Sequence, residues 1–187
     1  IREVIDDDPM VTQLHWLTGR NAGRYRFVET GLSLRARSRE QVEHALQRIE
    51  QAVRVAVPRI ERLVVQLEPA TSSEIRYALP VVEVDGPVSE HFGEAPYFTI
   101  LTLHKDDQSL VERRVITNPY RTLERGKGIR VAEWLVGQKV DVVMSREVLH
   151  GRGPAYVFRD AGVELKVIET KDIDAAISES STDPEVA

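Results

Sequence analysis

The use of basic residues changes abruptly near residue 80, and this change predicts two folded modules. All twelve Lys and Arg residues up to Leu79 are arginines, whereas five of the thirteen from Pro80 onward are lysines. A chain of 187 residues is long enough for two small domains, each with its own hydrophobic core. The stretch Glu68–Ser73 contains a proline and small polar residues, which is typical of a linker.

The composition excludes several classes of protein. No cysteine is present, so disulfides, thiolate-bound metals and cysteine nucleophiles are excluded, and any metal must be bound by nitrogen and oxygen atoms. The net charge of −5 argues against nucleic acid as a partner, because proteins that bind it concentrate Lys and Arg. No nucleophile lies beside a recognisable base, and neither an HExxH motif nor paired carboxylates occur. We therefore expect no enzyme.

The first module has the pattern of a small α+β domain. β-Branched and aromatic residues predict strands at Val11–Thr18 and Tyr25–Ala36, joined by a glycine-containing turn. Ser38 has a glutamine three residues later, as at a capped helix N-terminus, and apolar residues follow at helical intervals as far as Pro58. Arg59–Glu68 alternates again and predicts a third strand. We expect the helix to cover one face of the sheet.

Three polar residues of this module carry atoms that bind metals. His44 follows Val42 by two positions, about 200° around the helix, so it points away from the apolar stripe. Glu68 shares with Gln66 the sheet face opposite the apolar one, and His15 lies on the first strand. Two imidazoles and a carboxylate are suitable ligands for a divalent transition metal. Spacing alone favours three ordinary surface residues over a metal site.

Several motifs make residues 11–69 resemble the cytosolic C-terminal domain of cation diffusion facilitator transporters. The motifs are Leu14-His15, Arg20 and Gly23 in the turn, Glu43-His44-Ala45 in the helix, and Val64-Val65-Gln66-Leu67-Glu68-Pro69. The resemblance implies a ferredoxin-like, metallochaperone-like α+β domain that forms a homodimer beneath the membrane and binds a divalent cation, zinc or iron first, at its interface. It also implies that His15, His44 and Glu68 are the metal ligands, and that a transmembrane part of the same polypeptide precedes Ile1.

Two positions depart from that family pattern. Gly31 stands where some members have another histidine, and Gln66 replaces the usual histidine two residues before the acid. A glutamine carbonyl is a poor ligand for a borderline metal compared with imidazole. The metal site is therefore expected to be weak, altered or vestigial, and a weak site suits a sensor of rising metal better than a permanent structural site.

The second module begins, on this pattern, at Pro80 with a short strand at Val81–Val84. A hairpin and then alternating helices and strands follow, which predicts one mixed sheet with helices on its faces. The expected strands are 97–103, 110–116, 140–144 and 163–168, and the expected helices are 129–136, 154–161 and 171–177.

The segment Val88–Ala95 contains the sharpest motif of this module, Ser89-Glu90-His91-Phe92-Gly93. With Asn118-Pro119 and Gly126-Lys127-Gly128, it resembles the dinitrogenase iron–molybdenum cofactor domain of the NifX and NafY type. The resemblance implies a ribonuclease-H-like α/β fold over residues 80–178 and makes His91 the candidate ligand for an iron-containing cluster. Alternatively, the His91 ring bonds to the backbone of its own loop. Gly151 and Gly153, before a helix, either bind an anion or simply form a turn.

Together these observations lead to one hypothesis with two alternatives. The chain is expected to be the cytoplasmic regulatory and dimerisation region of a cation efflux transporter, an integral membrane protein, with an appended metallocofactor-type domain. It would comprise a connector (1–10), the dimerisation domain (11–70), the NifX-like domain (80–178) and a disordered tail (179–187). The alternatives are a free-standing carrier of an iron cluster or iron–molybdenum cofactor, and a protein-binding adaptor. Ligand types do not identify the physiological metal.

Overall fold

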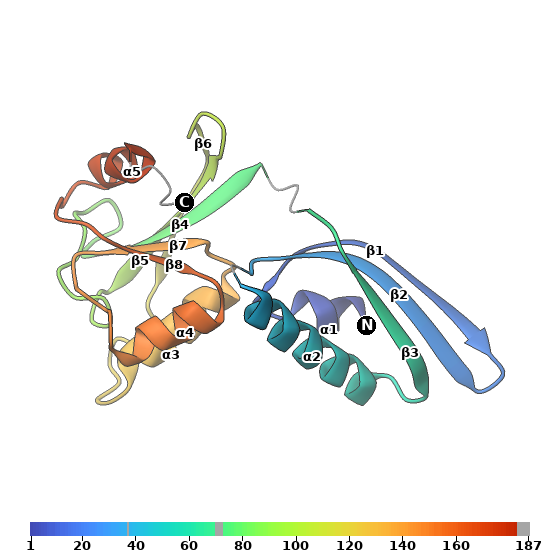
Figure 1. Cartoon of the computed structure of the whole chain (residues 1–187). Coiled ribbons are helices and arrows are strands. Elements are labelled where there is room, and N and C mark those ends of the chain that lie inside the picture. The colour runs from blue at the N-terminus through green and yellow to red at the C-terminus, as the bar shows by residue number, and fades with distance from the viewer. Residues whose placement is uncertain (37, 70–72, 183–187) are drawn as a thin grey trace. The chain divides into compact units, whose positions relative to one another are not determined.

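The chain divides into two compact units, Ile1–Ser72 and Ser73–Ala187, each built around its own sheet (Figure 1). The computed structural model describes residues 1–36, 38–69 and 73–182. Residues 70–72, in the predicted linker, and 183–187, in the predicted tail, lie outside the described residues. The boundary falls before the Pro80 that the change in composition indicated.

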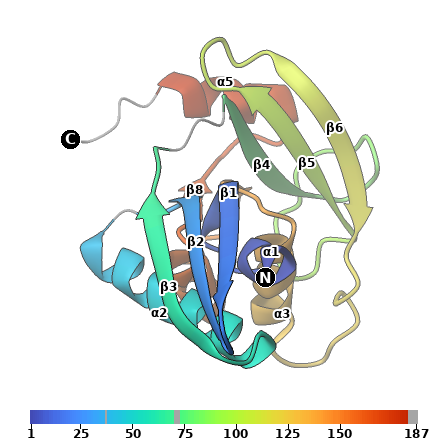
Figure 2. The ribbon, with the colours of Figure 1, turned by 90° about the vertical axis from the view of Figure 1, so that its right-hand side faces the viewer.

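The first unit is a three-stranded sheet with α2 along one face (Figure 1). Its strands lie side by side in the order β1-β2-β3, with β1 and β2 antiparallel and β2 and β3 parallel (Figure 2). The elements are α1 (Arg2–Asp6), β1 (Val11–Ala22), β2 (Tyr25–Leu34), α2 (Arg39–Ala56) and β3 (Ile60–Leu67). The predicted α+β unit is confirmed.

Local sequence explains how α2 forms and which face it buries. The Ser38 side chain accepts a hydrogen bond from the Gln41 backbone N–H at 3.2 Å, which satisfies one free donor of the first turn. Ala45, Ile49 and Val53 recur at helical spacing and are fully buried against the sheet. The remaining face of the helix is left to solvent.

The prediction of a connector at residues 1–10 is wrong. Residues 2–6 form α1, and Ile5 and Met10 are fully buried. The Asp8 carboxylate accepts a hydrogen bond from the Met10 backbone N–H at 2.9 Å and pairs with Arg48 of α2 at 3.1 Å. Asp8, the last of three consecutive aspartates, therefore fixes the entry into β1 against α2.

The second unit is a five-stranded mixed sheet between two helical layers. The strand order is β6-β5-β4-β7-β8. Strand β5 is antiparallel to its two neighbours, β4 and β6 (Figure 2), and β7 and β8 run parallel to β4. The elements are β4 (Glu74–Val81), β5 (Tyr97–His104), β6 (Leu110–Thr117), α3 (Lys127–Gly137), β7 (Val142–Ser145), α4 (Gly153–Asp160), β8 (Glu164–Val167) and α5 (Ile173–Thr182). Helices α3 and α4 cover one face and α5 the other, as expected for the mixed-sheet α/β domain (Figure 1).

Two element predictions in this unit were wrong. The first strand is not Val81–Val84 but Glu74–Val81, and Pro80 lies inside it. Proline is tolerated there because β7 pairs with β4 only at Tyr77 and Ala78, before the missing N–H. At the other end, residues 179–182 belong to α5, so the predicted disordered tail does not begin at residue 179.

An aromatic cluster positions the loop that follows β4. Phe92 is buried, and its ring makes edge-to-face contacts with Phe98 at 5.5 Å and with Phe158 at 5.8 Å between centroids. Contacts of this geometry add to the free energy gained from burying the rings. Phe92 therefore anchors its loop in the core and leaves the neighbouring His91 at the surface.

Candidate functional site

Ser33 links the His15 ring to the backbone of Glu68 on the sheet face opposite α2, which we call the open face. His15 Nε2 lies 2.7 Å from Ser33 Oγ, and Ser33 Oγ lies 2.9 Å from the backbone oxygen of Glu68 and 3.0 Å from that of Pro69. Ser33 is fully buried beneath these partners. The hydroxyl therefore joins β1 to the end of β3 across the central strand.

This arrangement fixes the protonation pattern of the His15 ring. The Ser33 hydroxyl has one proton, and both carbonyl oxygens beside it can only accept hydrogen bonds. When that proton is donated to a carbonyl, the hydroxyl oxygen accepts the His15 bond and Nε2 of His15 carries the proton. In the neutral ring this leaves the lone pair on Nδ1, the nitrogen that a metal would bind. A histidine that binds a metal through one ring nitrogen usually donates the N–H of the other to a neighbouring acceptor.

His44 lies on the other side of the unit. It is exposed on α2, which covers the opposite sheet face, so it does not join His15 and Glu68 within one chain. Within the described residues, no three His, Asp or Glu side chains are grouped closely enough to bind a metal ion. Gln66 is paired with Gly31 in the β2–β3 register, and both departures from the family pattern thus lie side by side on the open face.

In the second unit, His91 lies at a cavity of about 410 Å³ formed by two loops and the start of α3. The lining residues are His91, Phe92, Gly93, Glu94, Lys127, Gly128, Glu147, Leu149, Arg152 and Pro154. The glycine-rich loop before α4 thus converges with the His91 loop, but His150 does not line the cavity. His104 is an exposed residue at the end of β5.

Hydrogen bonds hold the two loops around this cavity. The Glu147 carboxylate accepts from the Phe92 backbone N–H at 2.8 Å and from the Arg152 guanidinium. The Asn118 amide donates to the carbonyls of Ala95 at 2.8 Å and of Gly93 at 3.3 Å. Asn118, part of the sequence motif Asn118-Pro119, therefore supports the His91 loop. Glu147 was not predicted, because it lies 55 residues from Phe92 in the sequence and contacts it only in the folded chain.

The His91 ring is not bonded to its own loop in the part of the chain that the structure describes. Its backbone is held instead, because the Ser89 hydroxyl donates to the His91 carbonyl at 3.0 Å and accepts from the His91 N–H at 3.2 Å. The exposed ring therefore keeps both nitrogens available at the edge of the cavity.

Ion pairs shape the charge around His91. A hydrogen bond from Lys127, at 3.1 Å, lowers the pKa of Glu94 below its usual range. A hydrogen bond from Arg146, at 3.0 Å, does the same to the pKa of Glu90, with a smaller effect from the Lys171 charge. Both carboxylates flanking His91 are therefore ionised and paired at neutral pH.

Gly93 allows the loop to approach α3 closely. A Cβ at this position would lie 3.1 Å from Lys127 Cγ and 3.3 Å from the Gly128 backbone nitrogen.

Within the described residues, no helix is long and apolar enough to cross a bilayer.

Comparison with solved structures gives neighbours for each unit. The apo form of the orange protein from Desulfovibrio gigas is 22% identical over 59% of this chain and 90% of its own, with a TM-score of 0.47. A putative NifB protein from Thermotoga is 27% identical over 57% of this chain and 87% of its own, with a TM-score of 0.45. A substituted form of the MamM CTD is 24% identical over 35% of this chain and 80% of its own, with a TM-score of 0.33.

Comparison with protein families covers both units, although no curated protein matches the chain. Residues 1–70 match the family described as the cation efflux protein, cytoplasmic domain. Residues 73–182 match the family described as dinitrogenase iron-molybdenum cofactor. Both resemblances stated from the sequence are confirmed, and they associate the chain with metals. Because the second match spans more than half of its length, this protein belongs to the dinitrogenase iron-molybdenum cofactor family through residues 73–182.

Proposed function

We propose that the first unit is the cytosolic dimerisation and metal-sensing region of a divalent-cation transporter, and that the second unit is an appended metallocofactor-type binding domain. The observation that carries the proposal is the hydrogen-bond chain from His15 through Ser33 to the end of β3. It supports a metal role because it orients a ring whose Nδ1 is left for a ligand. The match of residues 1–70 to a cation efflux cytoplasmic domain supports the class of transporter.

The donor atoms fit a borderline divalent cation such as zinc or ferrous iron. Strand alternation puts the Glu68 side chain on the open face, next to the backbone group that Ser33 binds. One imidazole and one carboxylate are too few for a tetrahedral site, so two copies of the chain are needed to supply four ligands. His44 would enter such a site only from the α2 of a second chain.

Such a site couples metal binding to dimer formation, because the metal binds the dimer more tightly than the monomer. If His15 and Glu68 complete a coordination shell only when two chains meet, metal stabilises the dimer by its difference in affinity for dimer and monomer. Gln66 and Gly31 supply no imidazole, so the affinity is expected to be modest. Dimer formation would then increase as the metal concentration rises. The orientation of the two paired units would bias the transmembrane part that is expected upstream of Ile1.

Sedimentation of residues 1–187 with and without Zn²⁺ tests this proposal, with Fe²⁺ under anaerobic conditions as a second probe. We expect metal to tighten the dimer by about tenfold or more, and the double variant His15→Ala, Glu68→Ala to remove that response. His44→Ala, examined separately, reports whether a second α2 contributes. His104→Ala is the matched control, because it removes an exposed histidine that belongs to the second unit. Tightening that persists in the double variant would falsify the proposal.

A second candidate function, a carrier of an iron-containing cluster, is favoured by the exposed His91 ring at its cavity. The cavity supplies one imidazole, and its two cations, Lys127 and Arg152, are each paired with a lining carboxylate, which leaves His91 as the group that would bind a cluster. Anaerobic mixing with a [4Fe–4S] cluster made from ferrous iron and sulfide, followed by desalting, tests this role. We expect visible absorbance to stay with the protein and to fall in His91→Ala but not in His104→Ala; no retained absorbance contradicts a carrier.

A further inference from the structure

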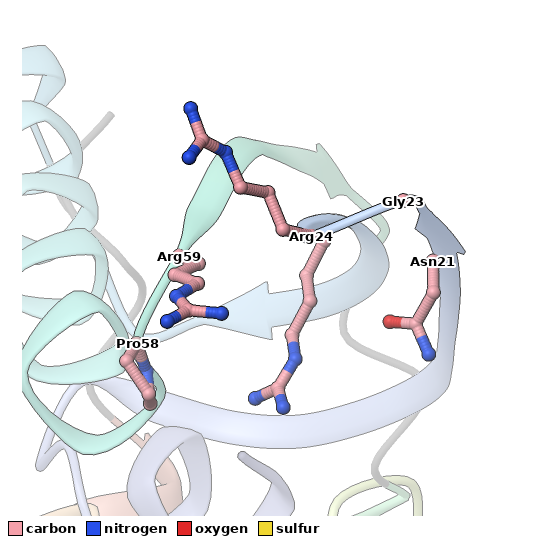
Figure 3. A pocket seen from close by; sticks show the side chains of 6 residues that line it. Asn21, Gly23, Arg24, Pro58 and Arg59 are labelled. Atoms are coloured by element: carbon pink, nitrogen blue, oxygen red, sulfur yellow. The ribbon is translucent and has the colours of Figure 1, made fainter.

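A hollow of about 310 Å³ lies at the tip of the first unit, far along the hairpin from Ser33. It is lined by Asn21, Gly23, Arg24, Arg26, Pro58 and Arg59, which come from the β1–β2 turn and from the turn between α2 and β3 (Figure 3). We call it the arginine hollow. Three of its six lining residues are arginines, and none carries a carboxylate.

The arginines of the hollow differ from the arginines of α2 in their partners. Arg39, Arg48 and Arg54 of α2 each pair with a carboxylate at 2.8 to 3.1 Å. Arg24, Arg26 and Arg59 form no ion pair within the described part of the chain. Positive charges gathered without a counter-ion repel one another, and a bound anion removes that repulsion.

Two of these arginines are held in place. The Arg24 guanidinium donates to the Tyr25 hydroxyl at 3.0 Å and lies over the Tyr25 ring at 5.1 Å. The backbone N–H of Arg26 donates to the backbone carbonyl of Arg59 at 2.9 Å, and this bond joins the turn before β3 to β2. Arg59 has a φ of 65°, a backbone conformation that residues other than glycine rarely adopt. The fold therefore brings these side chains to one hollow at some local cost.

We propose that the arginine hollow binds a phosphate group. Guanidinium groups bind phosphate oxygens through paired hydrogen bonds, and several of them around one hollow match the charge of a phosphate dianion. Asn21 lines the hollow on the side opposite Arg59 (Figure 3). The volume equals that of about ten water molecules in the liquid, which admits a phosphate together with part of the group that carries it. Free phosphate and a phospholipid headgroup share this chemistry.

Calorimetric titration of residues 1–187 with inorganic phosphate at low ionic strength tests the site. The test variant combines Arg24→Gln, Arg26→Gln and Arg59→Gly, where glycine keeps the positive φ without strain. The control combines Arg39→Gln, Arg121→Gln and Arg125→Gln, which removes the same charge from exposed positions outside the hollow. We expect saturable binding that weakens by about tenfold in the test variant and by less than about twofold in the control.

Cosedimentation with phosphatidylcholine vesicles, with and without phosphatidic acid, distinguishes the source of the phosphate. Vesicle binding that needs phosphatidic acid and is lost in the test variant alone identifies a lipid headgroup, whereas phosphate binding without vesicle binding identifies a free phosphate. Equal weakening in test and control variants, or no binding in either assay, overturns the proposal. Thermal unfolding of the single variant Arg59→Gly, which is expected to stay folded, is the control for folding. A loss of phosphate binding in this folded variant then reflects the missing guanidinium group.

Discussion

The indole of Trp16 lies directly over Gly31. A Cβ added to Gly31 would be 2.2 Å from Trp16 Nε1 and 2.6 Å from its Cε2. The glycine is therefore required by its neighbour on β1, and the histidine that some relatives have at this position could not be accommodated unless Trp16 moved. The two features were unconnected in the sequence, and together they explain one departure from the family pattern.

Substitution of Gly31 by alanine should destabilise the protein. The new methyl group would displace the indole, and such overpacking costs roughly 1–3 kcal/mol. Urea unfolding followed by tryptophan fluorescence measures the change, and the midpoint should fall.

Gly137→Ala is the matched control, since a Cβ there meets no atom within 4 Å. It should leave the midpoint unchanged or raise it, because alanine favours the helix more than glycine does. Equal stability of the Gly31→Ala protein and the unsubstituted one would contradict the packing argument.

Substitution of Ser33 by alanine should release the His15 ring. Nitrogen-15 NMR of the imidazoles is expected to show His15 with its proton on Nε2 in the unsubstituted protein and an ordinary mixture of tautomers in the variant. Because the carbonyls of Glu68 and Pro69 lose a donor, stability should also fall by about 1–2 kcal/mol. His104 is the internal reference in both spectra, and a His15 proton on Nδ1 at the outset would refute the assignment.

Substitution of Glu147 by alanine should loosen the loop that bears His91. The Phe92 N–H would lose its acceptor and exchange with deuterium faster, by about tenfold or more if one bond of 1–2 kcal/mol is lost. Hydrogen exchange measured by NMR checks this at the Phe92 amide. Glu133→Ala, which removes an exposed carboxylate paired with Arg130 on α3, should leave that amide unchanged.

The pKa of Glu90 should respond to Arg146. The hydrogen bond and charge of Arg146 lower this pKa below its ordinary value of 4.5, so the pair stabilises the fold above that pH and the contribution is lost as the pH falls through the lowered value. Glu90 is exposed, so the effect on stability is small. In a carbon-13 NMR titration, Arg146→Gln should raise the pKa of Glu90 towards 4.5, whereas Arg121→Gln should not change it.

Local patterns in the sequence predicted much of the fold. The Ser38 cap, the spacing of Ile49 and Val53, and the hairpin around Gly23 depend on neighbours within a few residues, and all are present. The start of β4 was missed because Pro80 breaks the strand pattern, and its tolerance depends on where a distant strand, β7, stops pairing. Burial of Ile5 was missed because it depends on α2 and the sheet.

The candidate sites were predictable only in part. The sequence identified His15 and His91 as residues whose chemistry could serve a site, and the structure places His15 beside the end of β3 and His91 at a cavity. Ser33 gave no signal, because a serine on a strand is ordinary until its partners, 18 and 35 residues away, are known. The arginine hollow was also missed, since its members are spread over two distant turns.

Strand β6, at one edge of the second sheet, carries Glu112, Arg113 and Arg114 on its exposed stretch. Edge strands offer a template on which other chains can add in β-conformation, and charged side chains there oppose such growth. A polypeptide rich in β-structure is thereby protected from fibrous aggregation at this border. Neutralising these three positions would be expected to shorten its lifetime in concentrated solution without disturbing either core.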